Sequence, residues 1–497
     1  MSLILSIDQG TTSSRAILFD SKARIVASDQ YEFEQIFPRA GWVEHDAEAI
    51  WQCQWRAIQG ALDKAAVDWT DVRAIGITNQ RETVVAWHAR TGKPIGNAIV
   101  WQDRRTAEYC QSLRRSGREE WIQKRTGLLL DPYFSASKMR WILRNREEAR
   151  ELAAQGQLRF GTIDSWLVWK LSAGRSHITD VSNASRTQLM DMEKCDWDET
   201  LLELFEVPSS TLPTIVDSSG ELARTDAGLT NREIPISGIA GDQQAALFGQ
   251  LCFQPGMVKS TYGTGCFILM NVGESPARSE NRLLSTVAWR VNGKTEYALE
   301  GSVFVGGAAV QWLRDQLKVI SSASEVEDLA RQVEDSEGVV VVPAFTGLGA
   351  PYWDPFARGS IMGLTRGSSV AHIARATLDG IANQVTDVIL AMAEDSGREL
   401  RELRADGGAS ANGLLMQIQA DVTNVEVNCP KILETTAMGA AFLAGLAVGF
   451  WPDRSALESL VEPDRVYHPR MDAPARSERM RLWRQAVERC CEWEAKE

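Results

Sequence analysis

The residues with the most evident chemistry lie near the start of the chain, at positions 8–15, with the sequence DQGTTSSR. They follow the apolar run at residues 3–7, so the pattern predicts a strand, a tight turn and a second strand. Gly10 permits a backbone bend that a residue with a Cβ atom resists. Hydroxyl side chains and free backbone N–H groups then crowd into one turn, which suits anionic oxygens. Asp8, at the strand end, could hold a metal ion or its waters beside them.

A hairpin with polar turn residues would have the same composition, so this segment alone is ambiguous. Similar strand ends farther along the chain favour the chemical interpretation. Apolar runs break into polar or glycine-containing loops at four more places, namely Gln80, Asp242, Thr264 and Asp406. In open α/β sheets, ligands lie beyond the carboxyl ends of strands. We therefore expect a cleft between two halves of the chain, lined by these loops.

The elements that must position these loops alternate between strands and helices, which predicts an α/β protein. Strands are expected at residues 3–7, 15–20, 24–28, 73–78, 233–240, 257–259, 266–270, 339–342 and 401–405. Asp46 is expected to cap a helix that reaches Lys64. The uncharged stretch 435–451 is short for a membrane span and rich in alanine and glycine. It predicts a buried, closely packed helix.

The strand–turn–strand pattern of residues 3–20 recurs at residues 257–270, where the turn is STYGTG. We interpret the recurrence as the start of a second domain, which gives an N-terminal domain at 1–250 and a C-terminal domain at 251–497. A chain of 497 residues is also too long for one hydrophobic core. Because Gly/Thr turns are common, coincidence is the alternative.

Charge and cysteine content argue against several classes of protein. The net charge of −13 disfavours broad binding to nucleic acid or to an anionic membrane. The eight cysteines form no C-x-x-C pair and the five histidines are scattered, so neither a zinc site nor a disulfide framework is expected. The N-terminus has no signal-peptide pattern. We therefore expect a cytoplasmic protein with no integral membrane segment.

Two common nucleotide-binding motifs are absent. The nearest P-loop candidate, residues 293–295, has Ala288 where the first glycine belongs. Residues 263–265, with the sequence GTG, lack the third glycine of the dinucleotide-binding motif. A nucleotide, if bound, therefore needs a different cradle.

Several segments, taken in order, resemble the FGGY family of sugar kinases within the actin–hexokinase superfamily. They are residues 8–15, 133–142, 241–244, 261–265, 359–379 and 406–408. Residues 41–46, 77–83, 131–134 and 345–353 are similar to the family members that phosphorylate glycerol. The resemblance covers nearly the whole chain. It implies two actin-like, ribonuclease H-like ATPase domains with an interdomain catalytic cleft. The implied activity is ATP:glycerol phosphotransferase, which forms sn-glycerol 3-phosphate and ADP in glycerol metabolism.

The resemblance also implies roles for individual residues. Asp242 matches the catalytic base, and Asp8 matches the carboxylate near Mg²⁺. Contacts to glycerol carry over to Arg81, Glu82, Tyr133, Asp242 and Gln243, with Trp101 and Phe267 against the carbon face. Contacts to ATP carry over to Thr11, Thr12, Ser13, Arg15, Thr264, Gly307, Gln311, Gly408 and Asn412.

These residue types suit the implied chemistry. For a small neutral polyol, Arg81 donates and Glu82 accepts hydrogen bonds, and Tyr133 and Gln243 add polar contacts. An aspartate with a reference pKa of ~3.9 is a weak base. That suffices for Asp242 when the transition state is loose and the proton leaves late.

Each residue alone also has a structural interpretation. Arg81 and Glu82 could be an exposed ion pair, and Asp242 could be a helix N-cap. The two aromatic residues could belong to the core, and we expect Lys138 and Trp141 to be packing and surface residues. A kinase for another polyol or a pentulose, and a non-catalytic actin-like ATPase, remain alternatives. Only the ordered combination of motifs favours the glycerol-phosphorylating kinase.

Regulation is where the sequence departs from its relatives. Some bacterial relatives bind fructose 1,6-bisphosphate through a glycine-rich loop and an arginine. Residues 226–233 lack the glycine run, and Glu233 stands where the arginine belongs, although Arg232 is adjacent. We therefore predict weak or absent inhibition by that sugar phosphate. The resemblance further implies a homodimer or homotetramer.

Overall fold

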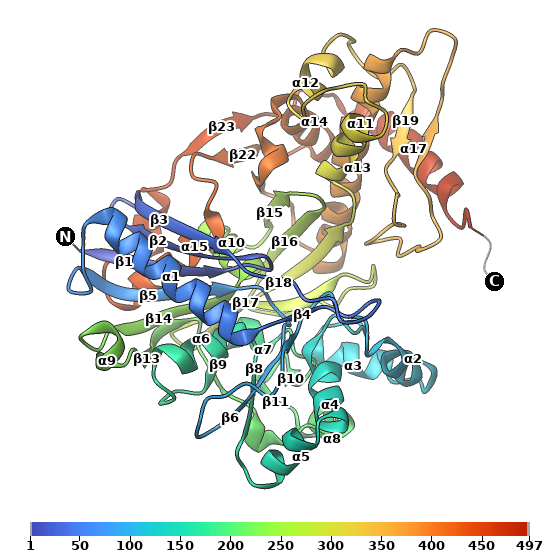
Figure 1. The fold of residues 1–497 in the computed structure, drawn as a ribbon. Coiled ribbons are helices and arrows are strands. Elements are labelled where there is room, and N and C mark those ends of the chain that lie inside the picture. Colours follow the sequence, from blue (N-terminus) through green and yellow to red (C-terminus); the bar gives the residue numbers. More distant parts are fainter. Residues whose placement is uncertain (1, 495–497) are drawn as a thin grey trace.

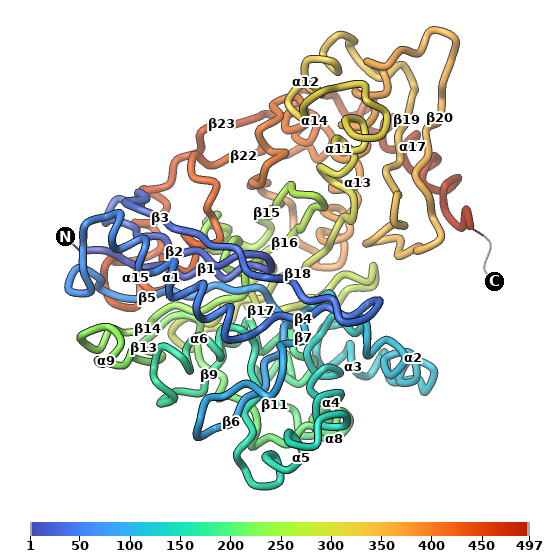
Figure 2. Tube along the Cα trace, viewed as in Figure 1, coloured from blue at the N-terminus to red at the C-terminus, as the bar shows by residue number. Residues whose placement is uncertain are grey.

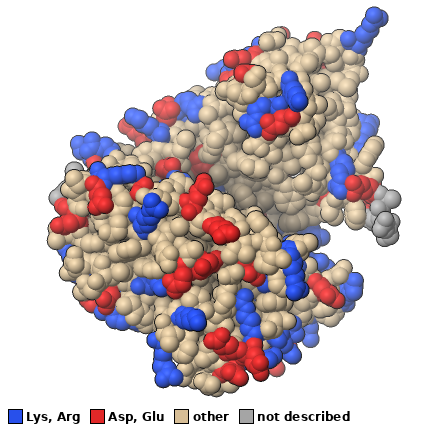
Figure 3. Space-filling model, viewed as in Figure 1, with Lys and Arg blue, Asp and Glu red and all other residues tan. Residues whose placement is uncertain are grey.

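The computed structural model describes residues 2–494 and shows an α/β protein, as the sequence predicts. Strands gather at the centre, and helices surround them (Figure 1). The Cα trace shows a large body that contains the N-terminus and an upper lobe formed by the second half of the chain (Figure 2). The surface is hollowed between these two parts (Figure 3).

The first half is built on β1 (Leu3–Gln9), β2 (Ser13–Phe19), β3 (Ile25–Glu32), β5 (Val72–Asn79) and β14 (Pro235–Gly241). The β1–β2 and β2–β3 pairs are antiparallel, whereas β1–β5 and β5–β14 are parallel. β3 runs past its predicted end at residue 28 because it pairs with β2 as far as Glu32. Helix α1 (Ala47–Ala65) packs on β2 and β3, and Asp46 caps it as predicted, by accepting the N–H of Glu48 at 2.8 Å.

The second half repeats this order with β15 (Met257–Tyr262), β16 (Cys266–Gly273), β18 (Lys294–Val303), β21 (Glu402–Asp406) and β22 (Val427–Pro430). The β15–β16 and β16–β18 pairs are antiparallel, and β15–β21 and β21–β22 are parallel. The recurrence inferred from the sequence is therefore a repeat of topology, and coincidence is the wrong interpretation.

Strands β13 (Ser219–Arg224), β17 (Leu284–Val291) and β23 (Pro463–Tyr467) complete one 13-stranded sheet. Its order is β23-β22-β21-β15-β16-β18-β17-β13-β14-β5-β1-β2-β3. The halves join where Ser219 of β13 pairs with Val291 of β17. Because the sheet continues across this junction, the division into domains 1–250 and 251–497 stays a prediction. Residues 495–497 of the second predicted domain lie outside the described residues.

Helices α10 (Asp242–Gly249) and α15 (Thr435–Ala447) cross at the centre of the molecule. α15 is the buried helix predicted from the uncharged stretch at 435–451. A Cβ atom on Gly439 would lie 1.8 Å from the carbonyl oxygen of Ala245, so only glycine permits this approach. Because α10 begins with Asp242, the crossing fixes the predicted catalytic base relative to the second half.

Further elements surround this centre. Around the first half lie β6 (Val85–His88), α2 (Ala107–Arg115), α3 (Glu119–Thr126), α4 (Ser135–Asn145), α5 (Glu147–Ala154), β8 (Leu158–Gly161), α6 (Ile163–Leu171), α7 (Val181–Ala184) and α8 (Glu199–Leu204). The upper lobe holds α11 (Gly307–Asp315), α12 (Glu325–Ala330), α13 (Val370–Ser396), α14 (Gly413–Thr423) and α17 (Ala473–Cys490).

The strand predicted at residues 339–342 forms as β19 (Val340–Val342) but lies outside the main sheet. It pairs with β20 (Ser360–Met362) in a separate two-stranded sheet. Over residues 2–494, no helix combines the length and the apolar character that crossing a membrane requires.

Candidate active site

Three polar loops of the first half meet at one edge of the sheet. β5 lies parallel between β1 and β14, so their carboxyl ends align, and Gln9, Asn79 and Gly241 are neighbours. This is the alignment expected when parallel strands end together. The predicted site residues at or just beyond these ends are Asp8, Arg81, Glu82, Asp242 and Gln243.

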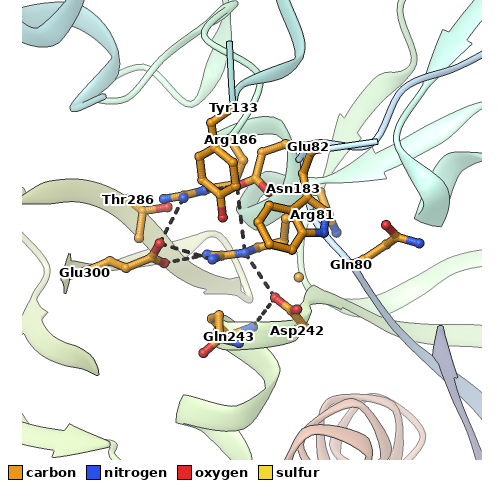
Figure 4. A network of polar contacts seen from close by, with 12 residues as sticks. Gln80, Arg81, Glu82, Tyr133, Asn183, Arg186, Asp242, Gln243, Thr286 and Glu300 are labelled. Atoms are coloured by element: carbon orange, nitrogen blue, oxygen red, sulfur yellow. Dashed lines mark hydrogen bonds and ion pairs between the residues drawn. The ribbon is translucent and has the colours of Figure 1, made fainter. Parts of the chain in front are cut away.

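Four buried charged side chains form one network beside Asp242 (Figure 4). Glu300 of β18 lies between two guanidinium groups. Arg81 Nη1 donates to Glu300 Oε2 at 2.5 Å, and Arg186 Nη2 donates to Glu300 Oε1 at 2.9 Å. Arg186 Nε also donates to Glu82 Oε1 at 2.6 Å. The charges alternate in sign, which is how buried ions are stabilised against the loss of water.

The interpretation of Arg81 and Glu82 as an exposed ion pair is wrong. Their residue exposures are 3% and 1%, and Arg81 Nε lies 3.9 Å from Glu82 Oε1. Each is instead held by a residue that the sequence analysis did not select. Burial raises the pKa of Glu82. Burial acts in the same direction on Glu300, but the guanidinium groups of Arg186 and Arg81 hold its pKa at about 2.

Asp242 is the accessible carboxylate of this group. Its side chain is 36% exposed, whereas that of Arg81, whose Nε lies 3.1 Å from Asp242 Oδ1, is 2% exposed. The same oxygen accepts the N–H of Gln243 at 2.7 Å. Gly241 occupies the N-cap position of α10, so the N-cap interpretation of Asp242 is wrong. A carboxylate oriented by an arginine and open on one side is suited to accept a proton from a bound hydroxyl group.

The aromatic side of the site contains Trp101 and Tyr133. Their rings meet edge to face with centroids 5.6 Å apart, and Trp101 Nε1 donates to Thr11 Oγ1 at 3.0 Å. A residue of the predicted polyol set therefore contacts one of the predicted ATP set. Phe267 is half-buried on β16, and within residues 2–494 its ring pairs with neither Trp101 nor Tyr133. The expected placement of two aromatic rings on one substrate stays a prediction.

Two buried lysines adjoin the predicted polyol residues. Lys259 of β15 has no exposed surface, and its Nζ donates to Oε1 of Gln243. Lys138 of α4 is likewise buried and donates to the carbonyl oxygens of Tyr133 and Phe134. Lys138 is thus a packing residue, and the expectation of a surface position is wrong for it. Burial lowers the pKa of both lysines, that of Lys138 to about 8.

The turn at residues 8–15 forms as predicted and faces the second half. Gly10 N–H donates to the carbonyl oxygen of Ser13 at 2.9 Å, which closes the turn. Thr12 is exposed, and Ser13 Oγ accepts Gln30 Nε2 at 2.7 Å. Arg15 Nη1 is ion-paired with Glu434, the residue that precedes α15.

Asp8 lies opposite Arg15 in the β1–β2 pair. Burial raises the pKa of its carboxyl group to about 6; Arg15 opposes this effect, and the carboxylates of Glu434 and Asp242 add to it. Among the described residues, no three His, Cys, Asp or Glu side chains are grouped as metal ligands. Mg²⁺ needs only one or two carboxylates when phosphate oxygens and waters supply the other ligands, so Asp8 fits such an ion.

The predicted ATP residues of the second half gather where β15 and β21 end. The N–H of Gly307, at the start of α11, donates to the carbonyl oxygen of Gly263 at 2.8 Å. Thr264, exposed in the same turn, accepts the N–H of Gly306 at 2.8 Å through its carbonyl oxygen. A Cβ atom on Gly307 would lie 3.9 Å from Cβ of Ala409, which places the short helix η2 (Gly408–Ala411) against this turn.

Three further residues complete this group. A Cβ atom on Gly408 would meet nothing within 4 Å, so the space beside it is open. Gln311 is exposed on α11. Asn412 caps α14 by accepting the N–H of Leu415 at 2.9 Å, which leaves its amide NH₂ to donate elsewhere.

Arg186, Glu300 and Lys259 contact the predicted site residues, and the sequence analysis did not identify them. Glu300 and Lys259 occupy buried positions of strands, and a charged residue among apolar strand residues is the signal that could have found them. Arg186 follows the short helix α7 and carries no comparable local signal.

Comparison with known proteins gives consistent matches over the whole chain. Residues 3–249 match the N-terminal domain of the FGGY family of carbohydrate kinases, and residues 258–448 match its C-terminal domain. Glycerol kinase of Alkaliphilus metalliredigens is 56% identical over 495 residues, with 99% of each chain covered. Glycerol kinase 2 of Thermotoga maritima is 54% identical, with 99% of this chain and 100% of that protein covered.

Solved structures agree with these matches. The structure of Plasmodium falciparum glycerol kinase with ADP superposes with a TM-score of 0.94 at 38% identity, covering 99% of this chain and 98% of that one. A ligand-bound xylulose kinase from Lactobacillus acidophilus superposes with a TM-score of 0.87 at 22% identity, covering 98% and 97%. The second similarity is one of fold alone.

Proposed function

The chain belongs to the FGGY family of carbohydrate kinases, and on that premise we propose that it transfers the γ-phosphoryl group of ATP to glycerol. The products are sn-glycerol 3-phosphate and ADP. The observation that carries the proposal is the part-exposed Asp242 carboxylate, which buried Arg81 holds at 3.1 Å beside the strand ends. The choice of glycerol is supported by full-length relatives at 54–56% identity that are glycerol kinases.

The buried network suits a small neutral polyol. Glu82 and Glu300 together balance the charges of Arg81 and Arg186 away from the solvent, so the network does not depend on substrate to hold its geometry. Arg81, Glu82, Tyr133 and Gln243 together offer the donors and acceptors that hydroxyl groups require. Preorganised groups of this kind lower the barrier because they need no rearrangement during the reaction.

In the proposed reaction, a terminal glycerol oxygen attacks the γ-phosphorus of ATP. A bond forms between that oxygen and phosphorus, and the bond from phosphorus to the β–γ bridging oxygen breaks, so ADP leaves. Asp242 accepts the proton of the attacking hydroxyl group. Little base strength is needed because phosphoryl transfer has a loose transition state and depends chiefly on alignment and charge neutralisation.

The phosphate chain of ATP would lie between the two strand–turn–strand units. Thr11, Thr12, Ser13 and Arg15 would contact it from the first half. Thr264, Gly307, Gln311, Gly408 and Asn412 would contact the nucleotide from the second half. Asp8 would hold Mg²⁺ through its waters, and the ion would neutralise charge on the phosphate oxygens.

The decisive experiment measures ADP release from Mg–ATP with glycerol, dihydroxyacetone, xylulose or no acceptor. We expect fast release with glycerol only, and about a 10²–10⁴-fold lower kcat in Asp242→Asn, because a positioned base contributes that much. Asp464→Asn is the matched control, since Asp464 is 52% exposed and its Oδ2 lies 3.6 Å from Nε of its neighbour Arg465. Preference for xylulose would contradict the substrate. Acceptor-independent release that is insensitive to Asp242→Asn would instead support a non-catalytic actin-like ATPase.

We expect this enzyme to act in the cytoplasm as a homodimer or homotetramer. Reduced surroundings are supported by the eight cysteines, all of which are free thiols. Weak inhibition by fructose 1,6-bisphosphate is supported by Glu233, whose carboxylate is paired with Arg175 Nη1 at 2.7 Å and would repel a phosphate.

A further inference from the structure

Lys259 is a buried cation that takes no part in the reaction proposed above. It lies on β15 without exposed surface, and its Nζ donates to Gln243 Oε1 and, at 3.1 Å, to Thr261 Oγ1. The charged groups that face it are the carboxylates of Asp406, Asp242 and Glu300 and the guanidinium group of Arg81. Burying an ammonium group costs free energy, so its persistence at this point of the site calls for a function.

The contact to Gln243 has a direction. A lysine ammonium group only donates hydrogen bonds, whereas an amide accepts at its oxygen and donates at its nitrogen. Lys259 therefore holds the carbonyl end of the Gln243 amide, and the NH₂ end is left for the substrate. Gln243 follows Asp242 in α10, so an amide donor and a carboxylate acceptor are neighbours at this end of the helix.

We propose that Lys259 is a positioning residue for phosphoryl transfer and acts through Gln243. By fixing the amide, it makes Gln243 a donor to the substrate hydroxyl oxygen, and the hydroxyl proton is directed to Asp242. With the amide reversed, the carbonyl oxygen of Gln243 would compete with Asp242 for that proton. The inference rests on the proposed function, because it requires a hydroxyl acceptor beside Asp242.

A double-mutant cycle tests the connection. Lys259→Met keeps the length of the side chain and removes the donor, and Gln243→Leu removes the amide. We expect Lys259→Met to lower kcat about 10–100-fold, with KM for ATP changed less than about 3-fold. In the Gln243→Leu background, the same substitution is expected to change kcat less than about 2-fold, because the amide that Lys259 positions is already absent. Independent losses that multiply would overturn the proposal.

Lys259→Gln separates the donor from the charge. It keeps an N–H donor in a neutral side chain, so we expect it to recover most of the kcat lost in Lys259→Met. Equal losses in the two variants would mean that the charge or the strand matters, and would overturn the proposal. If Lys259→Met does not fold, the cycle is run with Lys259→Gln. Any decrease in kcat that Lys259→Gln causes must then also vanish in the Gln243→Leu background.

The matched control is Lys64→Met, which makes the same substitution at a lysine that is 56% exposed and paired with Asp29. Its kcat should equal that of the unsubstituted chain, and thermal unfolding should confirm that all variants fold. The cycle uses whichever acceptor the unsubstituted chain phosphorylates fastest. A fastest acceptor other than glycerol would overturn the proposed substrate, while the cycle would still decide the role of Lys259. A chain that phosphorylates no acceptor would overturn both.

Discussion

The two halves of this molecule share one strand order and end their strands differently. In the first half, the loop after β5 supplies Arg81 and Glu82, which are buried and paired with Arg186 and Glu300. In the second half, the loops after β15 and β21 supply glycine, hydroxyl and amide groups, and Thr264 and Gly408 are exposed there, as is Gln311 on the adjacent α11. The shared strand order therefore brings loops together at one edge of the sheet in each half. The residues of those loops decide whether that edge is buried and charged or exposed.

The stability of the protein should depend more on single charges at the buried, charged edge of the first half than on those at the open edge of the second half. In Glu300→Gln, Arg81 and Arg186 lose their shared counter-ion, and we expect a loss of about 3–5 kcal/mol in the free energy of unfolding. Urea denaturation at pH 7 measures it. The folded pKa of Glu300 is about 2, below its unfolded value, so its stabilisation is present at neutral pH and is lost as pH falls toward 2.

Glu221→Gln makes the same substitution at the surface. Glu221 pairs with Arg224 at 2.8 Å, with side-chain exposures of 65% and 43%. We expect a change within about 0.5 kcal/mol, because exposed pairs contribute little. Equal effects of the two substitutions would mean that the buried network is no more important than a surface pair.

Asp8 should behave in the opposite way to Glu300. Burial raises its pKa to about 6, above its unfolded value, so the ionised carboxylate opposes folding above pH 6. In the absence of nucleotide, Asp8→Asn is expected to raise the free energy of unfolding by up to about 3 kcal/mol at pH 8. The gain should shrink as pH falls from about 6 to about 4 and disappear below about pH 3, where the carboxyl group is protonated in both states. Thermal unfolding across this pH range checks it, and a variant that is less stable at pH 8 would contradict it.

Two adjacent glycines test the open edge of the second half. Gly407 has φ +86°, and a Cβ atom there would lie 2.7 Å from the carbonyl oxygen of Tyr262. We expect Gly407→Ala to lose about 1–3 kcal/mol of stability through backbone strain.

Gly408→Ala is the matched variant and should have little effect on stability. A Cβ atom at Gly408 has nothing within 4 Å, so we expect a change within about 0.5 kcal/mol. If the open space receives ATP, KM for ATP should rise about 3-fold or more while stability is kept. Unchanged KM would remove Gly408 from the proposed nucleotide site.

Much of the architecture could be predicted from local sequence signals. Apolar runs that break into polar loops marked the strands of both halves, and Asp46 marked the start of α1, because strand and helix ends depend on neighbouring residues. The residues Asp8, Arg81 and Asp242 were found because each lies at or just beyond the end of a strand. The family motifs supplied the proposed roles.

Other features were decided only by the tertiary structure. The strand at Val340–Val342 formed where predicted but joined a separate sheet, because pairing depends on partners distant in sequence. Arg81 and Glu82 are adjacent in sequence, yet each is paired with a residue more than a hundred positions away, Glu300 for Arg81 and Arg186 for Glu82. The sequence by itself determined which residue types stand at the strand ends. Which charges neutralise one another, and that Lys259 holds Gln243, depended on how the fold places Glu300 of β18 and Lys259 of β15 beside residues of the first half. A charge is stable in the interior only where the fold supplies its partner.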